Sequence, residues 1–407
     1  MEDSESSRRP FLGMFKEVPK AVKWIIYLSC FSTVGYGYFI IVISAYLPEI
    51  GLKASDVGLL LGVNGISFAI TAIPLGIIAD RRGRKKMQLL GLLGIPPMLM
   101  VYALTTELAY LLIASVIAGV AEGAFMSSWN AIIADLTTVE TRNAAFVFSF
   151  IVGNVPFGIG FILPLFFPSI EETMGWSSHA VHSGTFFVLA LLSMISPIGI
   201  WHVLRDHKEK LNPEARLIRG KSTNTLLKFS GINSLIGLGA GFIIPLVPTW
   251  LWLKFGVPDS HSGPLLAVSS VTIGLAAVFS APLASRYGSV RAIVITQGFA
   301  TAFMLSLAYA STALLAGGLY LVRAALMNMA SPIADAYLMG IISKDSRSFA
   351  SALNALVWRL PNSASTVVGG IILGAGHYDI PFYLATAFYA SSVMLLYKVF
   401  KDVKPSG

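Results

Sequence analysis

Charged residues are scarce in this sequence. They make up 12% of its 407 residues, whereas hydrophobic residues make up 55%. A water-soluble domain normally carries about 25% charged residues, so this chain lacks the charge to cover a surface that faces water. The charges that it has lie in short segments between apolar runs of about 20 residues or more, the length at which a helix spans the core of a bilayer. The sequence therefore predicts many membrane-spanning helices.

Several other features are absent or rare. Cys30 is the single cysteine, which excludes a disulfide within one chain. Strand-like segments of alternating polarity are missing, which argues against a membrane barrel. There is no G-x-S-x-G elbow, no P-loop and no HExxH, and the six histidines lie in loops or near span ends. We therefore expect neither an enzyme nor an ATP-driven motor, and no cofactor or metal site.

Twelve spans are predicted from the apolar runs, with boundaries uncertain by a few residues. The first is too long for the core of a signal peptide, so we interpret it as a retained helix. The predicted spans are 23–47, 57–79, 88–105, 109–136, 143–167, 181–204, 228–253, 262–285, 290–311, 313–342, 347–374 and 380–400.

Basic residues are distributed unevenly around these spans. Odd-numbered loops contain only Lys53 and Lys254, and two arginines lie inside spans; every other Lys and Arg falls in an even-numbered loop or a terminus. By the positive-inside rule, both termini are cytoplasmic. The net charge of +8 then reflects membrane orientation, and we expect no nucleic-acid partner. The polar segment 205–227 is predicted to be a cytoplasmic linker, able to hold a short amphipathic helix, between domains 1–204 and 228–407.

An internal repeat supports this division. A shift of 205 residues superimposes the two halves without gaps over about 115 positions, and such a constant offset indicates duplication. Gly58 then falls on Gly263, Gly83 on Gly288, and Pro156 on Pro361. Six helices per half give both halves the same orientation, so the repeats are parallel.

The segment GIIADRRGRKK, residues 76–86, resembles the loop 2–3 signature of the major facilitator superfamily. The matching residues are Gly76, Asp80, Arg81, Gly83, Arg84 and Lys85. The segment VETR, with Glu140 and Arg142, is similar to the acidic–arginine element that follows span four in this family. Its counterpart in the second half is KDSR, with Asp345 and Arg347.

The resemblance implies an all-α membrane protein with twelve helices in two pseudo-symmetric six-helix bundles, and transport by alternating access. It also implies that the motif residues latch the cytoplasmic side. Physically, the arginines can pair with Glu140 or with carbonyls at helix C-termini, and Gly83 permits a sharp turn. The alternative is that these basic residues only fix the membrane orientation. Two departures weaken an antiporter assignment: Ala118 replaces an arginine expected in span four, and Val155 replaces a glycine in span five.

Four charged residues lie inside predicted spans. Because an ionised side chain at the bilayer centre costs roughly 2.5–3.5 kcal/mol, such residues normally face a cavity or a partner. Glu122, Arg323 and Arg359 lie near the midplane, where facilitator substrates bind, and Asp335 lies nearer the cytoplasm. The candidates for the substrate or proton path, chosen by helical periodicity, are Glu122, Arg323, Arg359, Asn154, Trp129, Tyr36, Tyr337 and Asp335.

Two roles for Glu122 remain open. In the first, it is the proton-sensitive group, and Arg323 and Arg359 set its charge or hold an anionic group. The reason is that burial raises the pKa of a carboxyl group, whereas a nearby arginine lowers it. In the second, Glu122 forms a static bridge with an arginine, since a buried pair is weak evidence of function.

We predict a multi-pass cell-membrane protein, monomeric by analogy with the family, that moves a small molecule by secondary transport. Proton-coupled export of amphipathic organic compounds is the leading hypothesis, since the path candidates combine aromatic residues with one acid. Uptake or exchange of an anionic metabolite through the arginines is the alternative. A function of another class, a sensor or lipid scramblase on the same fold, also remains open.

Overall fold

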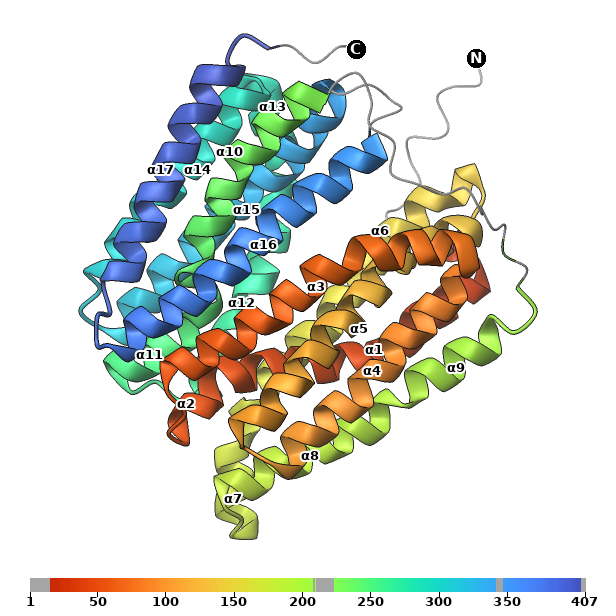
Figure 1. Ribbon diagram of the computed structural model, residues 1–407, viewed down its shortest axis with the longest axis vertical. Coiled ribbons are helices and arrows are strands. Elements are labelled where there is room, and N and C mark those ends of the chain that lie inside the picture. The colour runs from red at the N-terminus through yellow and green to blue at the C-terminus, as the bar shows by residue number, and fades with distance from the viewer. Residues whose placement is uncertain (1–14, 208, 210–222, 342–346, 404–407) are drawn as a thin grey trace. The chain divides into compact units, whose positions relative to one another are not determined.

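The computed structural model describes residues 15–207, 209, 223–341 and 347–403, and all regular structure in these ranges is helical. The segments 1–14, 210–222, 342–346 and 404–407 lie outside the described residues, and with them the predicted amphipathic linker helix. Within the described ranges the twelve predicted spans are confirmed as helical segments (Figure 1).

Seven spans are each a single helix. They are α3 (Ala54–Arg82), α4 (Arg84–Leu104), α5 (Leu108–Asp135), α14 (Ser289–Ala308), α15 (Ala313–Ile341), α16 (Arg347–Gly374) and α17 (Ile380–Phe400). The ends of α16 and α17 coincide with the predicted ends, because glycine and loop residues mark them in the sequence.

The other spans are interrupted. The first combines α1 (Lys20–Ile41), the π-helical turn η3 (Val42–Tyr46) and α2 (Leu47–Glu49). The fifth combines α6 (Val139–Ile162), η4 (Leu163–Phe166) and α7 (Phe167–Met174), and the sixth combines α8 (Ser178–Ser193) and α9 (Ile195–Val203). The seventh combines α10 (Thr223–Gly241), η5 (Ile244–Leu246) and α11 (Val247–Phe255), and the eighth combines α12 (Asp259–Val278) and α13 (Ser280–Tyr287). Pro164 and Pro245, at the starts of η4 and η5, remove backbone donors where α6 and α10 stop.

Ten segments in the described residues are long and apolar enough to cross a membrane. Large apolar side chains are exposed along many helices; Leu314, Leu104 and Val278 have exposed fractions of 89%, 76% and 70%. Such surfaces are unfavourable in water and suit contact with lipid. The protein is therefore a multi-pass membrane protein.

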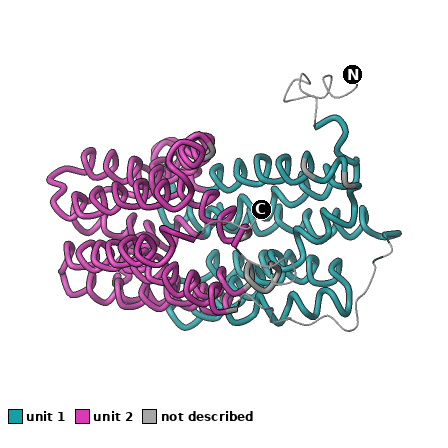
Figure 2. Tube along the Cα trace, turned by 90° about the horizontal axis from the view of Figure 1, so that it is seen from above, with its two compact units in different colours: residues 1–39, 70–160, 176–215 teal, residues 40–69, 161–175, 216–407 magenta. Residues whose placement is uncertain are grey.

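The chain divides into two compact units (Figure 2). Unit 1 comprises residues 1–39, 70–160 and 176–215, and unit 2 comprises 40–69, 161–175 and 216–407. In unit 1, α4 packs against α5 and α8 around a core that includes Ile26, Leu92 and Ile133. In unit 2, α14 packs against α15 and α17, and α10 against α16 and α17. These units cut across the two sequence halves, so the predicted domain boundaries stay a prediction.

The internal repeat is visible within unit 2. A Cβ added to Gly58 would meet the carbonyl oxygen of Thr366 at 2.7 Å, and one added to Gly263 would meet that of Phe161. The repeat offset of 205 residues carries Gly58 forward to Gly263 and Thr366 back to Phe161, so the second contact is the repeat equivalent of the first. Two helix contacts with no room for a side chain are thus related by the sequence repeat, as duplication requires.

Candidate functional site

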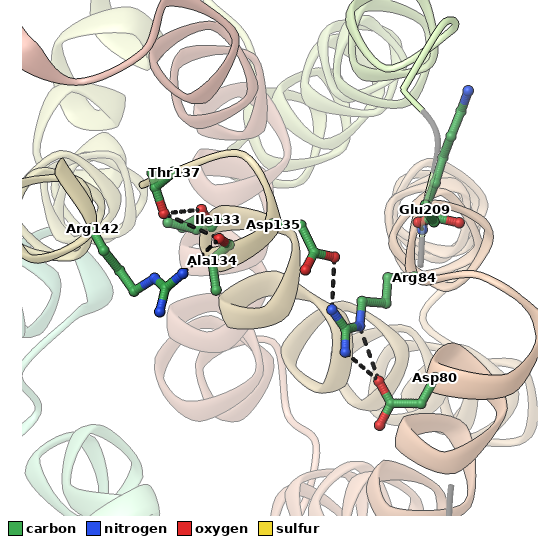
Figure 3. A network of polar contacts seen from close by, with 9 residues as sticks. Asp80, Arg84, Ile133, Ala134, Asp135, Thr137, Arg142 and Glu209 are labelled. Carbon is green, nitrogen blue, oxygen red and sulfur yellow. Dashed lines mark hydrogen bonds and ion pairs between the residues drawn. The ribbon is translucent and has the colours of Figure 1, made fainter. Parts of the chain in front are cut away.

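The loop between α3 and α4 is built around Arg84 (Figure 3). Its Nε and Nη2 donate to Asp80 Oδ1 at 2.9 and 2.8 Å, and its Nη1 donates to Asp135 Oδ2 at 2.6 Å. One guanidinium therefore joins the end of α3, the start of α4 and the end of α5. Its side chain is about a quarter exposed. Each ion pair alone is thus worth roughly 0.2–1 kcal/mol, and the network matters more than either pair.

The α4 N-terminus is capped from the linker. Gly83 is the N-cap residue, with φ of 114°, and it has no side chain to accept the free backbone N–H groups. Glu209 takes this role: its Oε1 accepts from the Lys85 N–H at 2.5 Å. A carboxylate is also favoured here by the helix dipole. The first residues of the linker are therefore attached to the loop motif.

Two basic residues bind carbonyls at helix ends. Lys85 Nζ donates to Leu204 O at 2.5 Å, just after α9, and Arg142 Nη2 donates to Ala134 O at 3.3 Å, near the end of α5. The prediction named the arginines of the loop motif as donors to helix C-terminal carbonyls, whereas the donors here are Lys85 and Arg142. Arg84 pairs with Asp135 rather than with Glu140, which is exposed in the first turn of α6.

Asp135 and Glu209 are the motif partners that sequence reasoning missed. Asp135 could have been found as the acid that ends span four, whereas Glu209 lies in a polar linker without a spacing signal. Two further motif residues are Gly76 and Arg81. A Cβ added to Gly76 would lie 3.6 Å from the Cβ of Ser127, and Arg81 is exposed. Arg347 begins α16, and Asp345 lies outside the described residues.

Within unit 1, Glu122 and Tyr36 are brought together. Glu122 lies near the middle of the 28-residue helix α5 and is partly buried. Its Oε2 accepts from the Tyr36 hydroxyl of α1 at 2.7 Å. The Tyr36 ring lies 5.5 Å from that of Phe39 and 6.5 Å from that of Phe157. An acid at mid-membrane depth is thus held by a phenol beside aromatic rings.

Within unit 2, Arg359 lies beside α3. Its guanidinium carbon is 5.2 Å from the centre of the Phe68 ring, a cation–π arrangement. Ser363 and Thr366, on the same helix as Arg359, are buried and pack against the glycines of α3. Small side chains there serve close helix approach.

Arg323 and Tyr337 occupy the core of unit 2. Arg323 and Tyr337 share one face of α15, and both are buried. Arg323 donates to the Tyr389 hydroxyl of α17. The Tyr337 hydroxyl donates to Val403 O at 2.9 Å, and its ring packs with Phe229 and Phe400. Both residues are buried in this structure, and their roles in a path stay predictions.

The other path candidates are scattered. Trp129 donates through Nε1 to Ser149 Oγ at 2.9 Å and stacks on Phe125. Asn154 is exposed, and its amide donates to Phe150 O at 2.7 Å in its own helix. Asp335 is exposed on α15. Their roles in a path stay predictions.

Comparisons with known proteins agree with this architecture. The chain is 24% identical to multidrug resistance protein 1 of Bacillus subtilis over 375 residues, covering 89% of this chain and 91% of that protein. It is 21% identical to the quinolone resistance protein NorA of Staphylococcus aureus over 393 residues, covering 92% and 95%.

Solved structures show the same fold. The nucleoside transporter NupG matches 95% of this chain and 100% of its own, with a TM-score of 0.69 and 16% identity. A bacterial homologue of the lysosomal transporter Spinster matches 93% and 94%, with a TM-score of 0.67 and 14% identity. A family model described as Major Facilitator Superfamily matches residues 25–228 and again 229–407. The chain therefore belongs to the major facilitator superfamily of transporters.

Proposed function

We propose that this transporter exports amphipathic organic compounds in exchange for protons, with Glu122 as the proton-carrying group. The observation that carries the proposal is the Tyr36–Glu122 hydrogen bond at mid-membrane depth in unit 1. The phenol can donate to the ionised carboxylate and can accept from the protonated acid, so this hydrogen bond is compatible with both protonation states.

The surroundings of this pair suit an amphipathic cargo. The aromatic rings of Phe39 and Phe157 lie beside Tyr36, and aromatic faces bind both apolar groups and organic cations. The names of two relatives, a multidrug and a quinolone resistance protein, point to the same class of cargo. Midplane acids facing a cavity are commonly part of proton pathways in transporters.

Proton flux in proteoliposomes tests the proposal. Vesicles loaded with a pH-sensitive dye receive lipophilic cations, organic anions or neutral sugars. We expect lipophilic cations to evoke proton flux that Glu122→Gln abolishes, because the amide cannot carry a proton. Tyr36→Phe, which keeps the ring, should shift the pH dependence of this flux. The matched control is Glu107→Gln, an exposed acid at the start of α5, which should leave the flux intact.

An equal flux in wild type and Glu122→Gln would reject the proton role and leave Glu122 as a structural partner. Anion-evoked flux that survives in Glu122→Gln would instead favour anion transport. That second candidate rests on Arg359, a partly exposed residue whose guanidinium lies over the Phe68 ring. Arg359→Gln should then abolish flux with anions and spare flux with lipophilic cations.

A further inference from the structure

Arg323 is a buried cation with neutral neighbours. Arg323 is 4% exposed and lies on α15 of unit 2, which packs against α12 and α14. Its Nη2 donates to the Tyr389 hydroxyl, and its guanidinium carbon lies 5.5 Å from the centre of the Tyr389 ring. Its Nε is buried without a hydrogen-bond partner. Within the described part of unit 2, no carboxylate forms an ion pair with Arg323.

Such a charge is costly. A guanidinium does not lose its proton in proteins, so burial cannot neutralise it as it can neutralise a lysine. A buried charge is tolerated when it is paired and its hydrogen-bond donors are satisfied. The tyrosine ring supplies a weak cation–π contact, which does not replace an anion.

The polar group that binds Arg323 is a hydroxyl, which can donate as well as accept. The Tyr389 oxygen accepts from Arg323, so its own proton must point to another acceptor. Tyr320 lies three residues before Arg323 on α15, so the two share one helix face, and the buried Ser269 hydroxyl of α12 has no hydrogen-bond partner. Tyr389, Tyr320 and Ser269 are 0%, 7% and 3% exposed. Buried hydroxyls from three helices thus accompany a guanidinium whose Nε lacks an acceptor.

We propose that α12, α15 and α17 hold a small monovalent inorganic anion, such as chloride, between Arg323, Tyr389 and Tyr320. The anion neutralises the guanidinium and accepts hydrogen bonds from Arg323 Nε and from the Tyr389 hydroxyl. The site is enclosed by buried side chains, which favours an ion of halide size over an organic cargo. It is separate from the Tyr36–Glu122 pair and does not depend on the proposed export function.

Thermal unfolding of the purified, detergent-solubilised full chain tests this site without substrate or gradient. Sodium gluconate is replaced stepwise by sodium chloride at constant ionic strength. We expect a saturable rise in Tm with chloride, because a ligand that binds only the folded state stabilises it. Tyr389→Phe should raise the half-saturating chloride concentration about tenfold or more, as expected when a hydrogen bond to a charged group is lost.

Two arginine variants complete the test. Arg323→Gln should abolish the chloride-dependent rise, whereas Arg286→Gln should retain it. Arg286 is the matched control because it makes a similar contact with a tyrosine ring: its guanidinium carbon lies 5.4 Å from the centre of the Tyr287 ring. Unlike Arg323, Arg286 is exposed. If Arg323→Gln does not fold, Tyr389→Phe carries the comparison. An unchanged wild-type Tm in chloride, or the same rise in Tyr389→Phe or Arg323→Gln, would overturn the proposal.

Discussion

A glycine at the start of α4 determines how that helix is capped. Gly83 has φ of 114° and ψ of 125°, a region that favours glycine over residues with a Cβ. Gly288, its repeat partner at the start of α14, has φ of 80°. The turn therefore requires glycine, and glycine lacks a capping side chain. Glu209 from the linker supplies the missing carboxylate, which couples the motif to the linker.

Gly83→Ala should therefore destabilise the protein. The new Cβ would meet Glu209 Oε2 at 2.5 Å and would occupy an unfavourable backbone conformation, which costs about 1–3 kcal/mol. Thermal unfolding should show a lower Tm. The control is Gly153→Ala in α6, where an added Cβ meets no atom within 4 Å and alanine favours the helix. Equal Tm changes in both variants would contradict this account of Gly83.

At the scale of helices, α3 and α16 meet along small residues. A Cβ on Gly58 would lie 2.7 Å from Thr366 O and 2.9 Å from the Gly370 Cα, and backbone atoms cannot move aside cheaply. The repeat-related Gly263 meets Phe161 O in the same way. Since the two contacts are equivalent by sequence and by geometry, they should respond alike to substitution.

Gly58→Ala and Gly263→Ala should each lower the stability of the folded protein by about 1–3 kcal/mol, the usual cost of overpacking. Thermal unfolding of each single variant measures the effect. Gly274→Ala in α12 serves as the control, because nothing lies within 4 Å of its added Cβ. A Tm for Gly58→Ala equal to that of the control would mean that α3 and α16 can separate without cost.

Helices were predictable from the sequence, whereas their environments were predictable only in part. The length of the apolar run and the Gly and Pro residues at its borders predicted both ends of α17 to the residue. Periodicity correctly placed Arg323 and Tyr337 on one face, but it cannot say whether that face meets a core, a cavity or lipid. The Tyr36–Glu122 bond joins residues 86 positions apart, so it required the folded chain. The role of Glu209 was invisible for the same reason.

At the scale of the whole molecule, membrane orientation is the property that sequence predicts without structural support. Basic residues concentrate in even-numbered loops and termini, so these are expected to be cytoplasmic. Because Cys30 is the single cysteine, Cys30→Ser gives a background for site-specific labelling. Two exposed positions on opposite predicted sides are Glu172 in α7 and Asp206 at the start of the linker.

In intact cells, a membrane-impermeant maleimide should label the Glu172→Cys variant and should leave the Asp206→Cys variant unlabelled until the membrane is permeabilised. The physical reason is that the cost of translocating loops rich in Lys and Arg keeps the linker inside. The Cys30→Ser background controls for unspecific labelling. Labelling of Asp206→Cys in intact cells, with protection of Glu172→Cys, would invert the orientation. It would also place the Arg84 network and Glu209 on the outer side, so a cytoplasmic latch would no longer be tenable.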